Sequence, residues 1–373
     1  MDTHPQIIHL QKRRPEAKQP GAVQNISVLS QQYGGRHAGG WVSSLPESWV
    51  PYVQLMRLSP PVALALIYFP HLLGSLLAAT LQGSSPKNII GANAVLLTWS
   101  LFFSNAAHAW NDLVDAPFDA AVARTCQRPI PRGAISPRAA LIFSFVQILI
   151  GLGVLHFGLA GTEGEFAVRY VVPNLFATIY YPYAKRHTHF AQLVLGVCLA
   201  WGVVVGCAAL GHEPFAIEPC LSLLGNEEIS TPATFRVSTP VLYLTGACVL
   251  WTAIYDTIYA HQDLPDDVKL GLRSMAVLLG EKGTKPVLSA FLCIMIVFLW
   301  LSGLSSDVMR TGAYMIIAPS GSAVSLGVMI TCVDLRDAQS CWTWFKYGYW
   351  GAGCCMAGGL LAEYLMDLMG FRS

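Results

Sequence analysis

Charged side chains are scarce in this sequence, since Asp, Glu, Lys and Arg make up only 12% of its 373 residues. A soluble domain carries about 25% charged residues, so the shortage needs an explanation. Hydrophobic residues reach 54% and gather in long runs, which supply that explanation. The net charge of +1 gives no indication of nucleic acid as a partner.

Cysteine spacings typical of metal sites are also absent. Ten cysteines are present, and most lie inside apolar runs, as Cys198 and Cys248 do. Cys354 and Cys355 are neighbours on a predicted helix, where adjacent side chains do not face one ligand. We therefore interpret the cysteines as small apolar packing residues.

Nine apolar stretches approach the length of about 20 residues that a helix needs to cross a bilayer. Eight of them are clear: 61–81, 88–110, 138–160, 190–210, 240–258, 286–304, 312–333 and 346–369. The ninth, 166–181, is shorter and carries Arg169 near its start. Lipid offers no partner to unpaired backbone groups, and the alternation typical of a barrel is not visible. The sequence therefore predicts an all-α polytopic membrane protein with nine transmembrane helices.

Basic residues are distributed unevenly between the two faces that nine spans create. Eighteen of the 23 Lys and Arg residues fall in the N-terminal segment and in the loops after the even-numbered spans. Because cytoplasmic loops are enriched in Lys and Arg, this face is predicted to be cytoplasmic. The longest segment on the opposite face, 211–239, is predicted to be a surface loop.

The chain divides into two unequal parts by composition. Residues 1–50 are polar and rich in Gly, Gln and Ser, which predicts a disordered cytoplasmic N-terminus, while 51–373 form one membrane-embedded domain. The basic residues 12–14 would suit a mitochondrial transit peptide, but acidic residues interrupt the segment and it is not amphipathic. We therefore expect the endoplasmic reticulum, with the mitochondrial inner membrane as the alternative.

A first acidic cluster, Asp112, Asp115 and Asp119, lies at the cytoplasmic end of the second span, next to Asn111. Spacings of three and four residues put the three carboxylates on one face of a helix, where they repel one another unless a cation lies between them. Carboxylate and amide oxygens suit Mg²⁺. Pro117 would break a regular helix, which predicts that Asp119 is presented from a turn.

A second acidic cluster, Asp263 and Asp267, lies at the cytoplasmic end of the sixth span. The two residues are i, i+4 neighbours, and Asp256 lies seven residues earlier on the face they share. Two acidic clusters that face each other would hold two or three Mg²⁺ ions around one diphosphate. Their equivalent places in the two halves of a membrane protein make the pattern specific.

A diphosphate also needs basic side chains, and each acidic cluster is followed by some. The loop after the first cluster carries Arg124, Arg128 and Arg132, the next cytoplasmic loop carries Tyr181, Lys185 and Arg186, and the second cluster is followed by Lys269 and Arg273. Arg and Lys in these places bind phosphate oxygens, although the charge bias of cytoplasmic loops explains them equally well. His108 lies one turn before the first cluster, but Mg²⁺ disfavours imidazole.

These motifs resemble those of the UbiA-type intramembrane aromatic prenyltransferases over residues 48–370. The matching pieces are Asn111–Asp119, Arg128–Gly133, Tyr181–Lys185, Tyr255–Asp267 continuing to Ser274, and Arg57 with Pro60 before the first span. The resemblance implies a nine-helix bundle with a central cavity, capped at the cytoplasmic side and open laterally to lipid.

The resemblance also implies roles for individual residues. Asp112, Asp115 and Asp119 would take one Mg²⁺, and Asp263 and Asp267 another, with Asp112, Asp115, Asp263 and Asp267 as the catalytic core. The substrate-binding set implied by the family pattern is Asn111, Arg128, Tyr181, Lys185, Arg57 and Arg273.

The N-terminal stretch Tyr33-Gly34-Gly35, with Gly39-Gly40-Trp41, resembles the fungal meroterpenoid branch of the family. That branch implies transfer of a farnesyl group from its diphosphate to a polyketide-derived phenolic acid, such as an orsellinic acid derivative. Ser104 stands where the ubiquinone branch carries Arg, and Ala191 replaces a Pro of that branch, so both positions favour the meroterpenoid branch.

Three alternatives remain open at this point. A terpene cyclase of the same superfamily would use the same metal site without an aromatic acceptor. A 4-hydroxybenzoate polyprenyltransferase of ubiquinone synthesis would use another acceptor. A transporter or scaffold would release no diphosphate, but transporter acids tend to lie at mid-membrane rather than at span ends.

Overall fold

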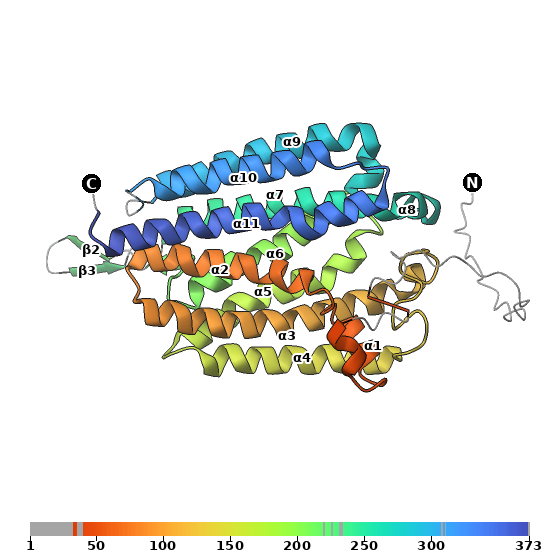
Figure 1. The fold of residues 1–373 in the computed structure, drawn as a ribbon. Coiled ribbons are helices and arrows are strands. Elements are labelled where there is room, and N and C mark those ends of the chain that lie inside the picture. The colour runs from red at the N-terminus through yellow and green to blue at the C-terminus, as the bar shows by residue number, and fades with distance from the viewer. Residues whose placement is uncertain are drawn as a thin grey trace, which may run out of the picture.

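The computed structural model describes residues 33–35, 40–218, 221–224, 227–230, 234–306, 309 and 311–371. Nine helices of at least 18 residues occur in this part of the chain and run lengthwise beside one another (Figure 1). They are α2 (Val62–Gln82), α3 (Pro86–Asp119), α4 (Pro137–Gly158), α5 (Glu163–Ala184), α6 (Ala191–Ala208), α7 (Thr239–Ala260), α9 (Met275–Leu304), α10 (Ala313–Cys332) and α11 (Ala338–Leu368). Each of the nine predicted spans coincides with one of these helices, so the predicted membrane fold is confirmed.

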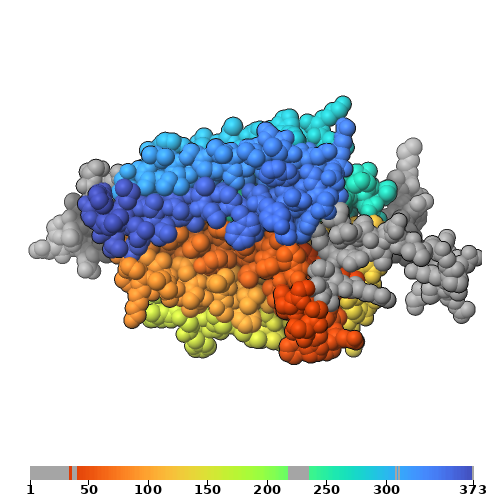
Figure 2. Space-filling view, in the orientation of Figure 1, coloured from red at the N-terminus to blue at the C-terminus, as the bar shows by residue number. Residues whose placement is uncertain are grey.

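Seven of the nine helices are long and apolar enough to cross a membrane by length and composition; α5 and α11 are the other two. The two more polar helices still belong to the bundle, because α5 packs along α6 and α11 packs along α10 and α2. Figure 2 shows α11 lying beside α2 on one face of the molecule. The chain is thus a multi-pass membrane protein.

Side-chain caps fix where several of the helices begin. Ser85, Ser136 and Ser274 accept hydrogen bonds from backbone N–H groups three residues later, at the starts of α3, α4 and α9. Asp337 does the same for two N–H groups of α11. Such caps satisfy donors that would otherwise lack partners at a helix start.

One end of the bundle, called here the charged end, carries α1 (Val50–Leu55), the loop 120–136, η3 (His261–Asp263) and α8 (Leu264–Leu270) (Figure 1). The predicted turn at Pro117 is wrong, because α3 continues through this residue and ends at Asp119. Pro117 lies within the last turn of the helix, where loss of one backbone hydrogen bond does not end it.

The opposite end contains short strands where the sequence predicted only a surface loop. β1 (Phe215–Glu218) pairs antiparallel with β4 (Thr234–Val237), and β2 (Leu221–Leu224) pairs antiparallel with β3 (Glu227–Ser230). Tyr170 of α5 donates a hydrogen bond to the carbonyl of Phe215, and Trp201 of α6 stacks on the ring of Phe215. These contacts attach the strands to the bundle.

Part of the segment 1–50 also has a defined place, contrary to the expectation of disorder. Residues 33–35 pack on the charged end, and Gly40–Ser44 form the 3-10 helix η2. Tyr33 is 6% exposed and accounts for the packing of the first of these pieces. Residues 1–32 and 36–39 lie outside the described residues, so the division at residue 50 stays a prediction.

Two helices of the core approach each other through glycine. A Cβ added to Gly206 of α6 would lie 2.1 Å from the His71 carbonyl oxygen of α2, and one added to Gly74 of α2 would lie 2.0 Å from the Val203 carbonyl oxygen. Small residues permit such close backbone approach between membrane helices. The crossing of α2 and α6 therefore depends on both glycines.

Candidate active site

A pocket opens at the charged end, between the ends of α3 and α7. Its walls carry ten of the side chains predicted from the sequence: Arg57, Asn111, Asp115, Asp119, Arg128, Tyr181, Lys185, Asp263, Asp267 and Arg273. Asp112, the remaining predicted residue, is 2% exposed and does not line the pocket. The two acidic clusters, which are far apart in the sequence, therefore meet in one pocket, while the roles of the individual residues stay predictions.

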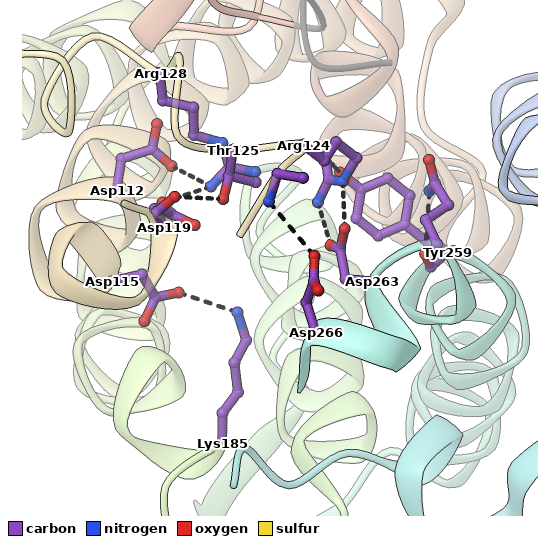
Figure 3. A network of polar contacts seen from close by, with 12 residues as sticks. Asp112, Asp115, Asp119, Arg124, Thr125, Arg128, Lys185, Tyr259, Asp263 and Asp266 are labelled. Carbon is purple, nitrogen blue, oxygen red and sulfur yellow. Dashed lines mark hydrogen bonds and ion pairs between the residues drawn. The ribbon is translucent and has the colours of Figure 1, made fainter. Parts of the chain in front are cut away.

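Two guanidinium groups neutralise the first acidic cluster from behind. Arg57 Nη2 donates to Asp112 Oδ1 at 2.8 Å. Arg128 Nη1 donates to Asp119 Oδ2 at 2.8 Å and to Asp112 Oδ1 at 3.3 Å (Figure 3). The Thr125 hydroxyl donates a hydrogen bond to the backbone carbonyl of Asp119 at 3.0 Å. Charge-assisted hydrogen bonds of this kind hold the loop 120–136 against the end of α3.

Lys185, at the end of α5, binds the third carboxylate of the cluster. Its Nζ donates to Asp115 Oδ2 at 3.0 Å and lies 5.5 Å from the centre of the Tyr181 ring. Burial alone would lower the pKa of the Lys185 ammonium, but the Asp115 carboxylate beside it raises that pKa above its ordinary value. Lys185 therefore keeps its positive charge inside the pocket.

Arg124 joins the two halves of the site. Its Nε donates to Asp263 Oδ1 at 2.7 Å and its Nη2 to Asp263 Oδ2 at 2.5 Å, while its Nη1 donates to the Tyr259 hydroxyl at 3.0 Å (Figure 3). Burial acts to lower the pKa of this guanidinium, but Asp263 raises it well above its ordinary value. Sequence reasoning grouped Arg124 with the basic loop and missed this pairing, for which no local sequence pattern gave a signal.

Two further predicted residues, Arg273 and Asn111, behave differently from one another. Arg273 lines the pocket, but its Nη1 donates to the His187 carbonyl at 2.7 Å, so it also fastens the loop after α5. Asn111 Oδ1 is buried and has no hydrogen-bond partner in the described part of the chain. A buried acceptor without a partner is costly, which marks Asn111 as an oxygen donor available to a ligand.

The donor set of the pocket fits a hard cation. Asn111 Oδ1 is free, Asp267 has no ion pair among the described residues, and the other carboxylates offer further oxygens. Oxygen-only ligation is what Mg²⁺ prefers. Within residues 33–371 as far as they are described, no three His, Cys, Asp or Glu side chains gather closely enough to hold an ion, because Arg and Lys side chains lie between the carboxylates.

Away from the charged end, the lining of the pocket becomes apolar. Leu66 and Ile67 of α2, Phe103 of α3, and Leu195 and Leu199 of α6 line this deeper part. Phe103 lies eight residues from Asn111 along α3, which corresponds to about 12 Å at the rise of an α-helix. The pocket therefore suits a long molecule with an anionic head and an apolar tail.

Tyr33 closes one side of the pocket, which no sequence motif predicted. Its hydroxyl donates to the Pro60 carbonyl at 2.8 Å, and its ring lies 5.9 Å from the Arg57 guanidinium and meets Trp342 edge-on. Gly35 N–H donates to the Gln127 carbonyl at 2.8 Å. Residues 33–35 thereby form a strap, called here the Tyr33 strap, that connects the N-terminal segment to the loop 120–136.

Replacing Gly34 with Ala should loosen the Tyr33 strap. A Cβ at this position would lie 2.6 Å from the Gln127 carbonyl oxygen, and a backbone clash of this kind costs about 1–3 kcal/mol. We expect the neighbouring Cys126 to be alkylated about tenfold faster, as monitored by peptide mass spectrometry. A tenfold change corresponds to a free energy of local opening that is lower by about 1.4 kcal/mol. Gly91→Ala is the control, since no heavy atom lies within 4 Å of its added Cβ. Equal alkylation rates in both variants would contradict this account of the strap.

The chain is similar to known proteins over most of its length. The family model of the UbiA prenyltransferase family matches residues 67–352. The chain is 33% identical to the mitochondrial 4-hydroxybenzoate polyprenyltransferase of Saccharomyces cerevisiae, over 89% of this chain and 81% of that protein. It is also 33% identical to the prenyltransferase stbC of Stachybotrys bisbyi, over 88% of this chain and 92% of that protein. A solved UbiA homologue from Archaeoglobus fulgidus, bound to GPP and Mg²⁺, covers 84% of this chain and 99% of its own, with 16% identity and a TM-score of 0.55.

Proposed function

The chain belongs to the UbiA prenyltransferase family, and we propose that it transfers a farnesyl group from farnesyl diphosphate to a ring carbon of a polyketide-derived phenolic acid. An orsellinic acid derivative is the proposed acceptor, in meroterpenoid biosynthesis. The observation that carries the proposal is the pocket itself, in which two acidic clusters, the buried Arg124 and Arg128 and the half-buried Lys185 lie at one end of an apolar channel.

The proposed reaction begins with ionisation of the allylic C–O bond of the prenyl diphosphate. Arg124, Arg128 and Lys185 are positioned to bind the diphosphate oxygens and to stabilise the charge that develops on the leaving group. Mg²⁺ held by the two acidic clusters and Asn111 would supply further positive charge there. The Archaeoglobus homologue bound to GPP and Mg²⁺ supports this assignment.

The allylic cation must then be protected from water until the acceptor attacks. The apolar side chains of α2, α3 and α6 exclude water from the deeper pocket, and the aromatic residues Tyr255, Tyr259 and Phe345 also line the pocket. Aromatic faces stabilise cations in a desolvated site. An electron-rich ring carbon of the acceptor then takes the prenyl group.

The acceptor is proposed from two neutral side chains beside the first acidic cluster. Ser104 is buried, and the Nδ1–H of His108 donates to the Ser104 carbonyl at 2.7 Å, so neither of these two side chains offers a fixed positive charge to an acceptor carboxylate. The fungal relatives stbC and ascA, each described as a prenyltransferase, support a fungal aromatic substrate. The second candidate is 4-hydroxybenzoate, which the similarity to the yeast enzyme favours.

The proposed compartment is the endoplasmic reticulum, with the charged end facing the cytoplasm. The distribution of Lys and Arg supports the orientation, since the loops at the charged end are the basic ones. The mitochondrial inner membrane is the alternative, because relatives that match most of the chain are mitochondrial proteins.

Microsomes from a host that expresses the chain test the proposal. They are incubated with Mg²⁺, farnesyl diphosphate and a panel of orsellinic-type acids that includes 4-hydroxybenzoate, and products are identified by mass spectrometry. We expect an orsellinate heavier by one farnesyl group, and we expect EDTA to abolish and excess Mg²⁺ to restore its formation. Transfer to 4-hydroxybenzoate alone would assign the enzyme to ubiquinone synthesis, and a terpene hydrocarbon alone would identify a cyclase.

A further inference from the structure

Asp256 is an acidic side chain of the pocket that the proposed binding of diphosphate does not use. It lies on α7, seven residues before Asp263, which is about 10 Å deeper along the helix. It lines the pocket with Tyr255 and Leu195, beyond the level of the two acidic clusters. Its position is therefore closer to the apolar half of the pocket than to the diphosphate end.

The carboxylate of Asp256, like that of Asp267, has no ion pair among the described residues, but Asp256 lies seven residues before the second acidic cluster rather than within it. Asp115, Asp119 and Asp263 each form an ion pair with a basic side chain. Asp256 has neither an ion pair nor a side-chain hydrogen bond among the described residues. Leaving a half-buried carboxylate without a hydrogen-bond partner is unfavourable, and such groups in a pocket are candidates for function.

We propose that Asp256 is the catalytic base that removes the ring proton during aromatic prenylation; this inference rests on the proposed function. The C1–O bond of the prenyl diphosphate breaks, and its electron pair leaves with the diphosphate. A π electron pair of the acceptor ring forms the new C–C bond to prenyl C1. The C–H bond at the substituted carbon then breaks, its electron pair restores the aromatic ring, and the proton moves to a carboxylate oxygen of Asp256.

His108 is another base that lines the pocket, and its surroundings make it a weaker candidate than Asp256. Its Nδ1–H is committed to the Ser104 carbonyl, so Nε2 is the atom that would accept a proton. His108 lies one turn from Asp112, which binds both Arg57 and Arg128. A proton on His108 would thus add a third positive charge beside two guanidinium groups, which is electrostatically unfavourable.

Asp256→Asn tests the proposal, because it removes the base but keeps the size of the side chain. Diphosphate release and prenylated acceptor are measured in the same reaction, with an acceptor carrying either hydrogen or deuterium at the substituted carbon. We expect the prenylated product to fall by about 10²-fold or more, while diphosphate release falls far less, the difference appearing as farnesol. The residual transfer should show a primary deuterium isotope effect that the unmodified enzyme lacks.

Two further variants make the result decisive. Asp263→Asn should lose diphosphate release and prenylated product together, and His108→Gln should keep the unmodified ratio of product to released diphosphate. An Asp256→Asn enzyme that loses both activities in parallel with no isotope effect, or that keeps full transfer, would overturn the assignment. The assignment would also be overturned if His108→Gln, rather than Asp256→Asn, released diphosphate without forming the prenylated product. If the unmodified enzyme itself releases diphosphate without prenylating any acceptor, the proposed function fails as well, which separates the two failures.

Discussion

Asp263→Asn is expected to lower the kcat of prenyl transfer by about 10³-fold, which corresponds to about 4 kcal/mol of barrier. Asp263 anchors Arg124 through two hydrogen bonds and contributes carboxylate oxygens to the second acidic cluster. The Asn variant removes the negative charge but retains an oxygen that can accept one hydrogen bond from Arg124. It therefore tests charge while limiting the penalty of leaving a buried guanidinium without any partner.

Initial rates with purified protein in detergent, at saturating Mg²⁺ and substrates, measure this effect. Asp266→Asn is the matched control, because Asp266 lies three residues away but does not line the pocket and pairs with the exposed Lys269. An exposed pair contributes little, so this control should stay within a few-fold of the unmodified rate. Near-normal turnover in Asp263→Asn would show that the second acidic cluster is assigned wrongly.

Gly206→Val is expected to have the largest effect on the folded protein. Its Cβ would lie 2.1 Å from the His71 carbonyl oxygen and 2.9 Å from the Ser75 N atom, so α6 must move away from α2. Both obstacles are backbone atoms of a helix, which have little room to shift, and overpacking of this kind costs about 3 kcal/mol or more. Because α2 and α6 also carry the apolar wall of the pocket, activity should fall together with stability.

Thermal unfolding in detergent measures the loss of stability. It is monitored through the reaction of a thiol-reactive dye with Cys207 and Cys248, which are buried in the folded protein. Gly153→Val is the control for introducing a β-branched residue into a membrane helix, since no heavy atom lies within 4 Å of its added Cβ. We expect a clear fall in apparent Tm for Gly206→Val and almost none for Gly153→Val. Equal behaviour of the two variants would mean that α2 and α6 do not depend on close contact at Gly206.

The apolar runs and the spacing of acidic residues were enough to predict the bundle and the location of the site. Runs of about 20 apolar residues leave helices as the main choice in lipid, and Asp112 and Asp115 lie on the helix face that their spacing predicted. These are local properties, because they depend on residues within two or three turns of one another. Pro117 shows the limit of local reasoning. It was predicted to break the helix, but α3 continues through it because it lies in the last turn.

The contacts that complete the site could not be predicted, because they join residues far apart in the chain. Arg124 and Asp263 are 139 positions apart, and the choice between Arg124 and Arg128 as the partner of Asp263 depends on how the loop 120–136 folds. Tyr33 reaches the pocket from a segment whose composition indicates disorder. In both cases packing between distant elements, rather than a periodic pattern, determined the result.

The ion pairs of the site also imply an order in which the chain can be assembled during synthesis. The first acidic cluster finds its partners in Arg57, Arg128 and Lys185, all of which precede α6. A nascent chain that has inserted only α2 to α5 thus already contains this cluster with its charges balanced. Arg124 is different, because its side-chain hydrogen bonds among the described residues all go to α7 and the η3 turn, which includes Asp263. Arg124 therefore has no carboxylate partner until the second half of the protein is inserted, and its attraction to Asp263 then stabilises the association of the two halves.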